Sequence, residues 1–365
     1  MRLGSLDQAL VWEPDPKLGW RSIPGAKKLW TEEGHGLIEI NSLGYRDRER
    51  RLEKTPGVFR IAVFGDSTTQ AVQVNLEQTF CYLLEEKLRT PEAPVEVLNF
   101  GVNGYSPIQE LLLLKEEGPR YRPDLVILAL FLDNDVSGVH PDLSVVSQAG
   151  PPYVIFSGDT LQFDFTQAQH SFAQYHQQPF YLLRQHSAAF RLISAYRWRH
   201  TVTEMTPDTS GSLILQRYLL YRRPPELQWE KAWQTLERVI LEFVAETQRQ
   251  QIPLVILSVP AAQVVSKSAW KNILQSYPAM NGVEWDLEDP ERRIKMFAQK
   301  HGLAILQPYK TYQEAENGPP LFFGSVGHMT ADGHYLLAQA LEKFVLENHL
   351  LNARKKESFP SGGEK

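Results

Sequence analysis

Residues 58–70 read VFRIAVFGDSTTQ, a short apolar run that ends in Gly65 and continues directly into small polar residues. An apolar run of this length without alternating polar residues is typical of a parallel strand buried on both faces. The segment 76–88 follows, with Phe80 and Leu84 on one helical face. The pattern therefore predicts a strand that turns through a small polar loop into a helix.

The same alternation recurs along the chain. Further apolar runs predict strands at 95–100 (VEVLNF), 124–131 (DLVILALF), 253–260 (PLVILSVP) and 303–306 (LAIL), and helical periodicity predicts helices at 107–117, 229–243, 290–301 and 331–347. Strands that alternate with helices imply a parallel sheet with right-handed crossovers. The predicted fold class is α/β, a three-layer α/β/α sandwich around a five-stranded parallel sheet.

Two regions depart from this rhythm. Residues 1–57 are rich in Pro and Gly, which predicts a loop-and-hairpin extension packed on the core of a domain spanning 58–350. Residues 136–225 are rich in Pro, Gln and aromatic residues and predict an insertion, with a hairpin turning at Ser157-Gly158-Asp159. The insertion either shapes the active site or is peripheral. The tail 351–365 is expected to be disordered.

Composition narrows the classes of partner. The net charge of −5 and the pI near 6.1 argue against nucleic acid, which selects a basic surface. The single cysteine, Cys81, lies in an apolar helical pattern and is interpreted as a buried hydrophobe. No stretch is long and apolar enough for a transmembrane segment, and Met1 is not followed by a signal segment, so the default expectation is a cytoplasmic protein.

Polar or glycine-bearing residues follow the strands at the edge where parallel sheets bind ligands. Gly65-Asp66-Ser67 follows the first strand, a loop ending in Gly104 the second, and Asp133-Asn134-Asp135 the third. His328 follows the last strand after a longer loop. We therefore expect Ser67, Gly104, Asn134 and His328 to meet at one sheet edge.

These residue types are those that acyl transfer requires. A serine hydroxyl becomes a nucleophile when a histidine within hydrogen-bond reach takes its proton. The oxyanion of the tetrahedral intermediate needs donors already in place, which the Ser67 and Gly104 amides and the Asn134 side chain would supply. Taken singly, Ser67 has the alternative role of a helix N-cap, and Asn134 that of a turn residue.

Four blocks in this order resemble the signature blocks of the SGNH (GDSL-type) hydrolases: GDS with Ser67, NFGVNG with Gly104, the Asn134-Asp135 pair, and HMTADGH with His328. The flanking LGWRSIPG, NSLGYRD and FRIAVFGDSTTQ resemble bacterial members with an N-terminal extension. The resemblance implies an SGNH/flavodoxin-like fold. It also implies Ser67 as nucleophile, His328 as general base, and Ser67, Gly104 and Asn134 as the oxyanion hole.

The triad acid is missing from its usual place. The family places an Asp two or three residues before the catalytic His, where this chain has Val326 and Ser325. Three interpretations remain open. A backbone carbonyl or Ser325 orients His328 in a Ser-His dyad, an acid from elsewhere does so, with Asp332 nearest in sequence, or hydrolysis has been lost.

The predicted function is a metal-independent serine esterase that works through an acyl-enzyme and needs no cofactor. Its substrates would be acyl or acetyl esters of carbohydrates or lipids. An SGNH-type O-acetyltransferase and a non-catalytic SGNH-like binding module are the alternatives. Relatives of this type are often envelope proteins, so envelope association is the alternative to a cytoplasmic location.

Overall fold

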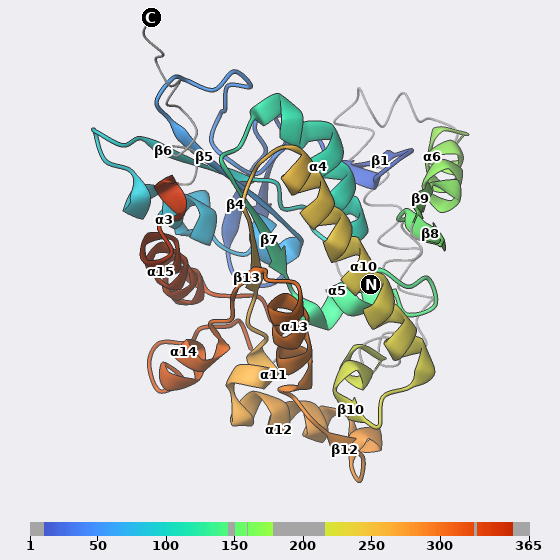
Figure 1. The fold of residues 1–365 in the computed structure, drawn as a ribbon. Coiled ribbons are helices and arrows are strands. Elements are labelled where there is room, and N and C mark those ends of the chain that lie inside the picture. The colour runs from blue at the N-terminus through green and yellow to red at the C-terminus, as the bar shows by residue number, and fades with distance from the viewer. Residues whose placement is uncertain (1–10, 145–149, 159, 178–215, 325–326, 353–365) are drawn as a thin grey trace, which may run out of the picture.

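The computed structural model describes residues 11–144, 150–158, 160–177, 216–324 and 327–352 (Figure 1). Its centre is a five-stranded sheet with the strand order β13-β11-β7-β5-β6, and every neighbouring pair is parallel. The strands are β5 (Phe59–Gly65), β6 (Val95–Asn99), β7 (Leu125–Leu130), β11 (Leu254–Ser258) and β13 (Ala304–Leu306). The five strands predicted from apolar runs are confirmed, as is the fold class.

Successive residues of the central strands face opposite sides of the sheet, so each strand contributes to two apolar cores. Ala62 and Phe64 of β5 pack into one core, which contains residues of α4 (Pro107–Tyr121), α10 (Leu227–Arg249) and α13 (Asp289–Lys300). Ile61 and Val63 face the other core, which contains residues of α3 (Phe80–Leu88) and α15 (Ala331–Glu347). Figure 1 shows these two helical layers on either side of the sheet.

Two predicted elements differ in detail. The helix expected at 76–88 is a 3-10 turn, η1 (Leu76–Gln78), followed by α3, because Thr79 is extended between them and its hydroxyl accepts from the Tyr82 amide. The residues after β7, expected as a polar loop, form the short helix α5 (Leu132–Gly138). The remaining short helices are α2 (Ser67–Gln70), α11 (Ala262–Val265), α12 (Lys267–Ser276), η4 (Pro278–Met280), α14 (Tyr309–Glu314) and η5 (Leu350–Asn352).

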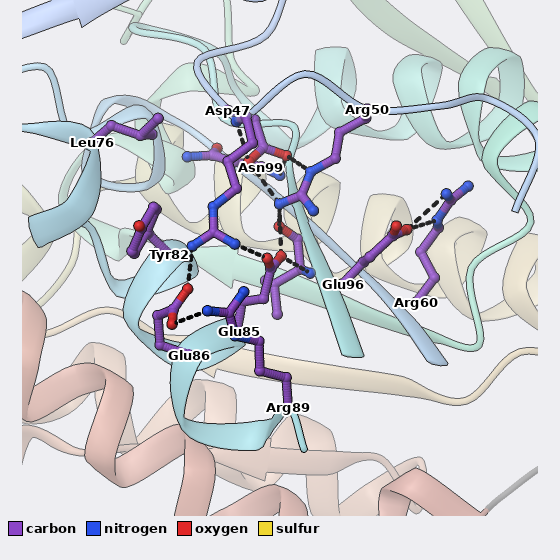
Figure 2. A network of polar contacts seen from close by, with 12 residues as sticks. Asp47, Arg50, Arg60, Leu76, Tyr82, Glu85, Glu86, Arg89, Glu96 and Asn99 are labelled. Atoms are coloured by element: carbon purple, nitrogen blue, oxygen red, sulfur yellow. Dashed lines mark hydrogen bonds and ion pairs between the residues drawn. The ribbon is translucent and has the colours of Figure 1, made fainter. Parts of the chain in front are cut away.

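The N-terminal segment, residues 11–57, forms two hairpins. They pair β1 (Trp12–Asp15) with β2 (Gly19–Ser22) and β3 (Lys27–Trp30) with β4 (Gly36–Glu39). Beyond them, Arg50 donates to Asp47 and to Glu85 of α3 (Figure 2). Arg48 also pairs with Glu85 and with Glu86. This ionic network attaches the segment to the α/β body.

The insertion is described in part. The predicted hairpin is β8 (Tyr153–Ser157) paired with β9 (Thr160–Asp164), although its turn residue Asp159 lies outside the described residues. Helix α6 (Thr166–Gln177) follows, and η3 (Leu219–Tyr221) leads into β10 (Arg222–Arg223), which pairs with β12 (Glu284–Trp285). Most of the predicted tail also lies outside the described residues. None of the described helices is both long and apolar enough to cross a membrane.

Candidate active site

The loop between β5 and α2 presents Ser67 at the carboxyl edge of the sheet. Asp66, not Ser67, caps the helix: its Oδ1 accepts from the Thr68 amide at 2.8 Å and from the Thr68 hydroxyl at 2.7 Å. The N-cap role weighed for Ser67 is therefore filled by its neighbour. The Ser67 hydroxyl instead lies 2.9 Å from His328 Nε2.

The loop before α15 presents His328 from the opposite end of the chain. Its backbone is held in place because its carbonyl accepts from the Phe323 amide at 2.9 Å, and Met329 forms a β-bridge with Phe322. Its side chain is 30% exposed, while the Ser67 residue is 7% exposed. The imidazole thus faces a nearly buried hydroxyl and still borders solvent.

The other ring nitrogen of His328 contacts a carboxylate that the sequence did not single out. Nδ1 lies 2.5 Å from Oε2 of Glu33, and the His328 amide donates to Glu33 Oε1 at 2.9 Å. Glu33 lies between β3 and β4 in the N-terminal segment, 295 residues from His328. The structure therefore brings together Ser67, His328 and Glu33 in a line of two hydrogen bonds.

The two residues that the sequence offered as partners of His328 are Asp332 and Ser325. Asp332, proposed for its proximity in sequence, lies in the first turn of α15 and does not contact the His328 ring, whose Nδ1 is taken by Glu33. Ser325, the alternative partner, lies outside the described residues. His334, the other histidine of the HMTADGH block, is buried against Phe80, and burial lowers its pKa to about 3.

Asn134 joins the site from α5. Its Nδ2 donates to Asp66 Oδ2 at 2.7 Å, which orients the side-chain amide beside the loop that bears Ser67 and leaves its second N–H for another acceptor. Gly104 adopts a φ of +77° in the loop after β6. That loop abuts α2, because a Cβ on Gly101 would lie 2.5 Å from the Gln70 amide nitrogen. Gly104 is not among the residues that line the pocket.

A pocket opens over Ser67 and His328. Its wall includes four apolar side chains, Phe131, Pro260, Phe322 and Met329. Asp133 and Arg217 line it as an ion pair of 2.8 Å, and Asp133 also accepts from the Gln263 side chain at 2.5 Å. Arg217 belongs to the insertion, so this region contributes to the pocket wall.

Two further carboxylates are buried near Asp66. Burial and the neighbouring carboxylates raise the pKa of Glu110 and of Asp135 well above their ordinary values. Asp135 accepts from the Phe131 amide at 2.7 Å and so anchors the start of α5.

Neither a protein-family model nor a curated protein sequence matches the chain. Solved structures of esterases align with most of it. A lipase/acylhydrolase from Enterococcus faecalis is 12% identical and aligns over 80% of this chain and 96% of its own, with a TM-score of 0.40. A G-D-S-L family lipolytic protein from Veillonella parvula is 12% identical. It aligns over 79% of this chain and 97% of its own, with a TM-score of 0.39.

An acetyl xylan esterase is 14% identical and aligns over 79% of this chain and its whole length, with a TM-score of 0.41. At such identities and TM-scores, these are proteins to which the chain is similar.

Proposed function

We propose that the chain is an SGNH-type serine ester hydrolase in which Ser67 is the nucleophile and His328 the general base. The observation that supports this most directly is the 2.9 Å contact between Ser67 Oγ and His328 Nε2 in a pocket open to solvent. A serine and a histidine at this distance satisfy the geometric requirement for nucleophile activation.

The reaction would proceed through a covalent intermediate. Ser67 Oγ attacks the ester carbonyl while His328 Nε2 takes the hydroxyl proton, and the tetrahedral intermediate then expels the alcohol, which receives that proton. Water attacks the acyl-enzyme with the same base, which releases the acid and restores the Ser67 hydroxyl. The Ser67 amide and the second N–H of Asn134 are the proposed oxyanion donors closest to the nucleophile, and the Gly104 amide is a third.

The pocket wall favours an ester with a small or apolar group. Phe131, Phe322 and Met329 present apolar surface next to the nucleophile. The only cation lining this pocket among the described residues, Arg217, is paired with Asp133. The substrate class proposed is therefore uncharged acyl or acetyl esters.

The first test compares hydrolysis of p-nitrophenyl acetate by the wild-type protein and by Ser67→Ala. Loss of the nucleophile is expected to lower kcat by about 10⁴-fold or more. His328→Ala should cause a comparable loss. Ser276→Ala, which removes an exposed serine on α12, is the matched control and should retain full activity.

Covalent labelling checks the same residue without turnover. A fluorophosphonate should label the wild-type protein and Ser276→Ala, but not Ser67→Ala. Equal labelling of the wild-type protein and Ser67→Ala would exclude Ser67 as the nucleophile and, with it, the proposed hydrolase.

A further inference from the structure

We propose that Glu33, supplied by the N-terminal segment, is the positioning residue of His328, so that this segment completes the active site. The inference rests on the proposed function, because it assigns the third member of the same Ser-His pair. It replaces the acid that the sequence lacks in front of His328. It also gives the N-terminal segment, which the sequence predicted only as an extension packed on the core, a direct role in the proposed reaction.

The two contacts of Glu33 fix both the place and the tautomer of the imidazole. One carboxylate oxygen holds the backbone amide of His328 at 2.9 Å, and the other lies 2.5 Å from Nδ1. A carboxylate only accepts, so Nδ1 carries the proton and Nε2 presents its lone pair to Ser67. The same carboxylate stabilises the imidazolium that forms when Nε2 takes the serine proton.

Three glycines permit this approach. A Cβ on Gly327 would lie 2.2 Å from Glu33 Oε1, so a side chain there would displace the carboxylate. On the other side, Cβ atoms on Gly34 and Gly36 would lie 2.4 Å from the carbonyl oxygens of Gln73 and Val72, respectively. Gly34 also has a φ of +67°, which disfavours any other residue. The turn that bears Glu33 therefore lies directly against the backbone that follows the nucleophile helix.

Arg46 forms hydrogen bonds with both the segment that bears Glu33 and the backbone that follows Ser67. Its guanidinium is fully buried and donates to the Gln70 and Ala71 carbonyls at 2.9 and 2.7 Å, which end α2. It also donates to the carbonyls of Leu37 at 3.2 Å and Val74 at 2.5 Å. Since Leu37 lies in β4 and Gln70 lies in the helix that begins at Ser67, one side chain connects both partners of His328.

Other carboxylates near the site are engaged elsewhere. Asp66 accepts from Thr68 and Asn134, and its distance to the Ser67 hydroxyl is 3.5 Å. Glu32, next to Glu33 in the chain, is exposed. Among the described residues, Glu33 is the one carboxylate within ion-pair distance of His328. Glu32 is therefore a matched control for the charge of Glu33.

The test compares Glu33→Gln, Glu33→Asp and Glu32→Gln with the wild-type protein in steady-state hydrolysis of p-nitrophenyl acetate. Glu33→Gln keeps the size of the side chain and is expected to lower kcat by about 10² to 10⁴-fold, with KM within about threefold. Glu33→Asp restores the negative charge and should recover at least about tenfold over Glu33→Gln. Glu32→Gln and Asp332→Asn should remain within about twofold of wild type.

The result separates this inference from the proposed function. If Ser67→Ala is inactive but Glu33→Gln retains wild-type kcat, the hydrolase stands and the role of Glu33 is wrong. A loss of kcat in Glu33→Gln that Glu33→Asp does not relieve, accompanied by a lower midpoint of thermal unfolding, would show a structural role only and would also overturn the inference.

Proton NMR gives a readout that does not need turnover. A proton shared between imidazole Nδ1 and a carboxylate resonates far downfield, so wild-type protein and Glu32→Gln should show this signal, and Glu33→Gln and His328→Ala should lose it. Even if no esterase activity is found, persistence of the signal in Glu33→Gln would refute Glu33 as the partner of His328.

Discussion

The N-terminal segment and the insertion are both additions to the parallel α/β body, and both contribute side chains to the pocket region in different ways. The N-terminal segment contributes Glu33, which contacts the histidine, whereas the insertion contributes Arg217, which lines the pocket wall. The first contact bears on the proposed reacting groups. The second bears on the space that a substrate would occupy.

The two regions are also anchored differently. Arg46 in the N-terminal segment binds four backbone carbonyls, whose positions vary little when side chains change. Arg217 in the insertion is held by one carboxylate, Asp133, and its side chain is 24% exposed. A group that must hold an imidazole within a few tenths of an ångström needs the first kind of anchor, and a group that shapes a pocket tolerates the second.

The largest effect is expected at Arg46. Replacing it by Met removes a buried donor from four carbonyls and should lower the free energy of unfolding by about 3 kcal/mol. Burial lowers the pKa of Arg46 to about 10, so the side chain is still charged at neutral pH. Urea denaturation measures the change. Arg51→Met, which removes an exposed arginine of the same segment, should stay within about 0.5 kcal/mol of wild type.

One result of the comparison between Arg46→Met and Arg51→Met would contradict the prediction. If Arg46→Met and Arg51→Met unfold at the same urea concentration, then the backbone anchoring described above contributes nothing to stability, and the contrast between the two regions disappears.

Glu291 lies in the α/β body, outside both the N-terminal segment and the insertion, and serves as a reference for the stability effects expected in those two regions. Burial raises its pKa to about 7, although hydrogen bonds from Ser258 and Gln307 act in the opposite direction. The protonated carboxyl of Glu291 makes its full contribution to the free energy of unfolding below the pKa of the unfolded chain, near 4.5. That contribution is lost as the pH rises through 7. Glu291→Gln should therefore be more stable than wild type at pH 8, by at most about 3 kcal/mol.

The measurement is urea denaturation of both proteins at pH 5 and pH 8. The advantage of Glu291→Gln should shrink at the lower pH, where the wild-type carboxyl is mostly protonated in the fold. An advantage of equal size at both pH values would mean that the titration of Glu291 is not its cause.

The smallest effect is expected at Arg217. Arg217→Gln keeps a donor for Asp133 but changes the pocket wall. The value of kcat/KM for p-nitrophenyl acetate should therefore change by less than about threefold. The value of kcat/KM for longer acyl esters should change by about tenfold. Arg222→Gln, outside the pocket lining, is the control. A loss of kcat on p-nitrophenyl acetate as large as that of Glu33→Gln would remove the distinction between the two regions.

The sequence predicted the body of the fold because buried strands and amphipathic helices leave local patterns. It also predicted that Ser67, Asn134 and His328 would lie near one another, since each follows a strand of the same parallel sheet. Glu33 left no such pattern. It lies in a polar turn, TEEGHG, where an acidic residue is ordinary, and its partner is 295 residues away.

Proximity in sequence pointed instead to Asp332, which α15 holds in its first turn without contact to the His328 ring. The available signal was the pair Gly34 and Gly36, which follow Glu33 in the same turn, because closely spaced glycines mark places where backbones approach. That signal indicates a close contact but not its partner. Only the tertiary structure identifies the carboxylate that reaches His328.

The separation of Glu33 from His328 has a consequence for the order of folding. Contacts between residues 295 positions apart close the largest loops and form after local elements have gained stability. A chain emerging from the ribosome carries Glu33 and Ser67 long before His328 is synthesised. The proposed esterase activity is therefore expected to appear late in folding, after the parallel sheet has acquired its secondary structure.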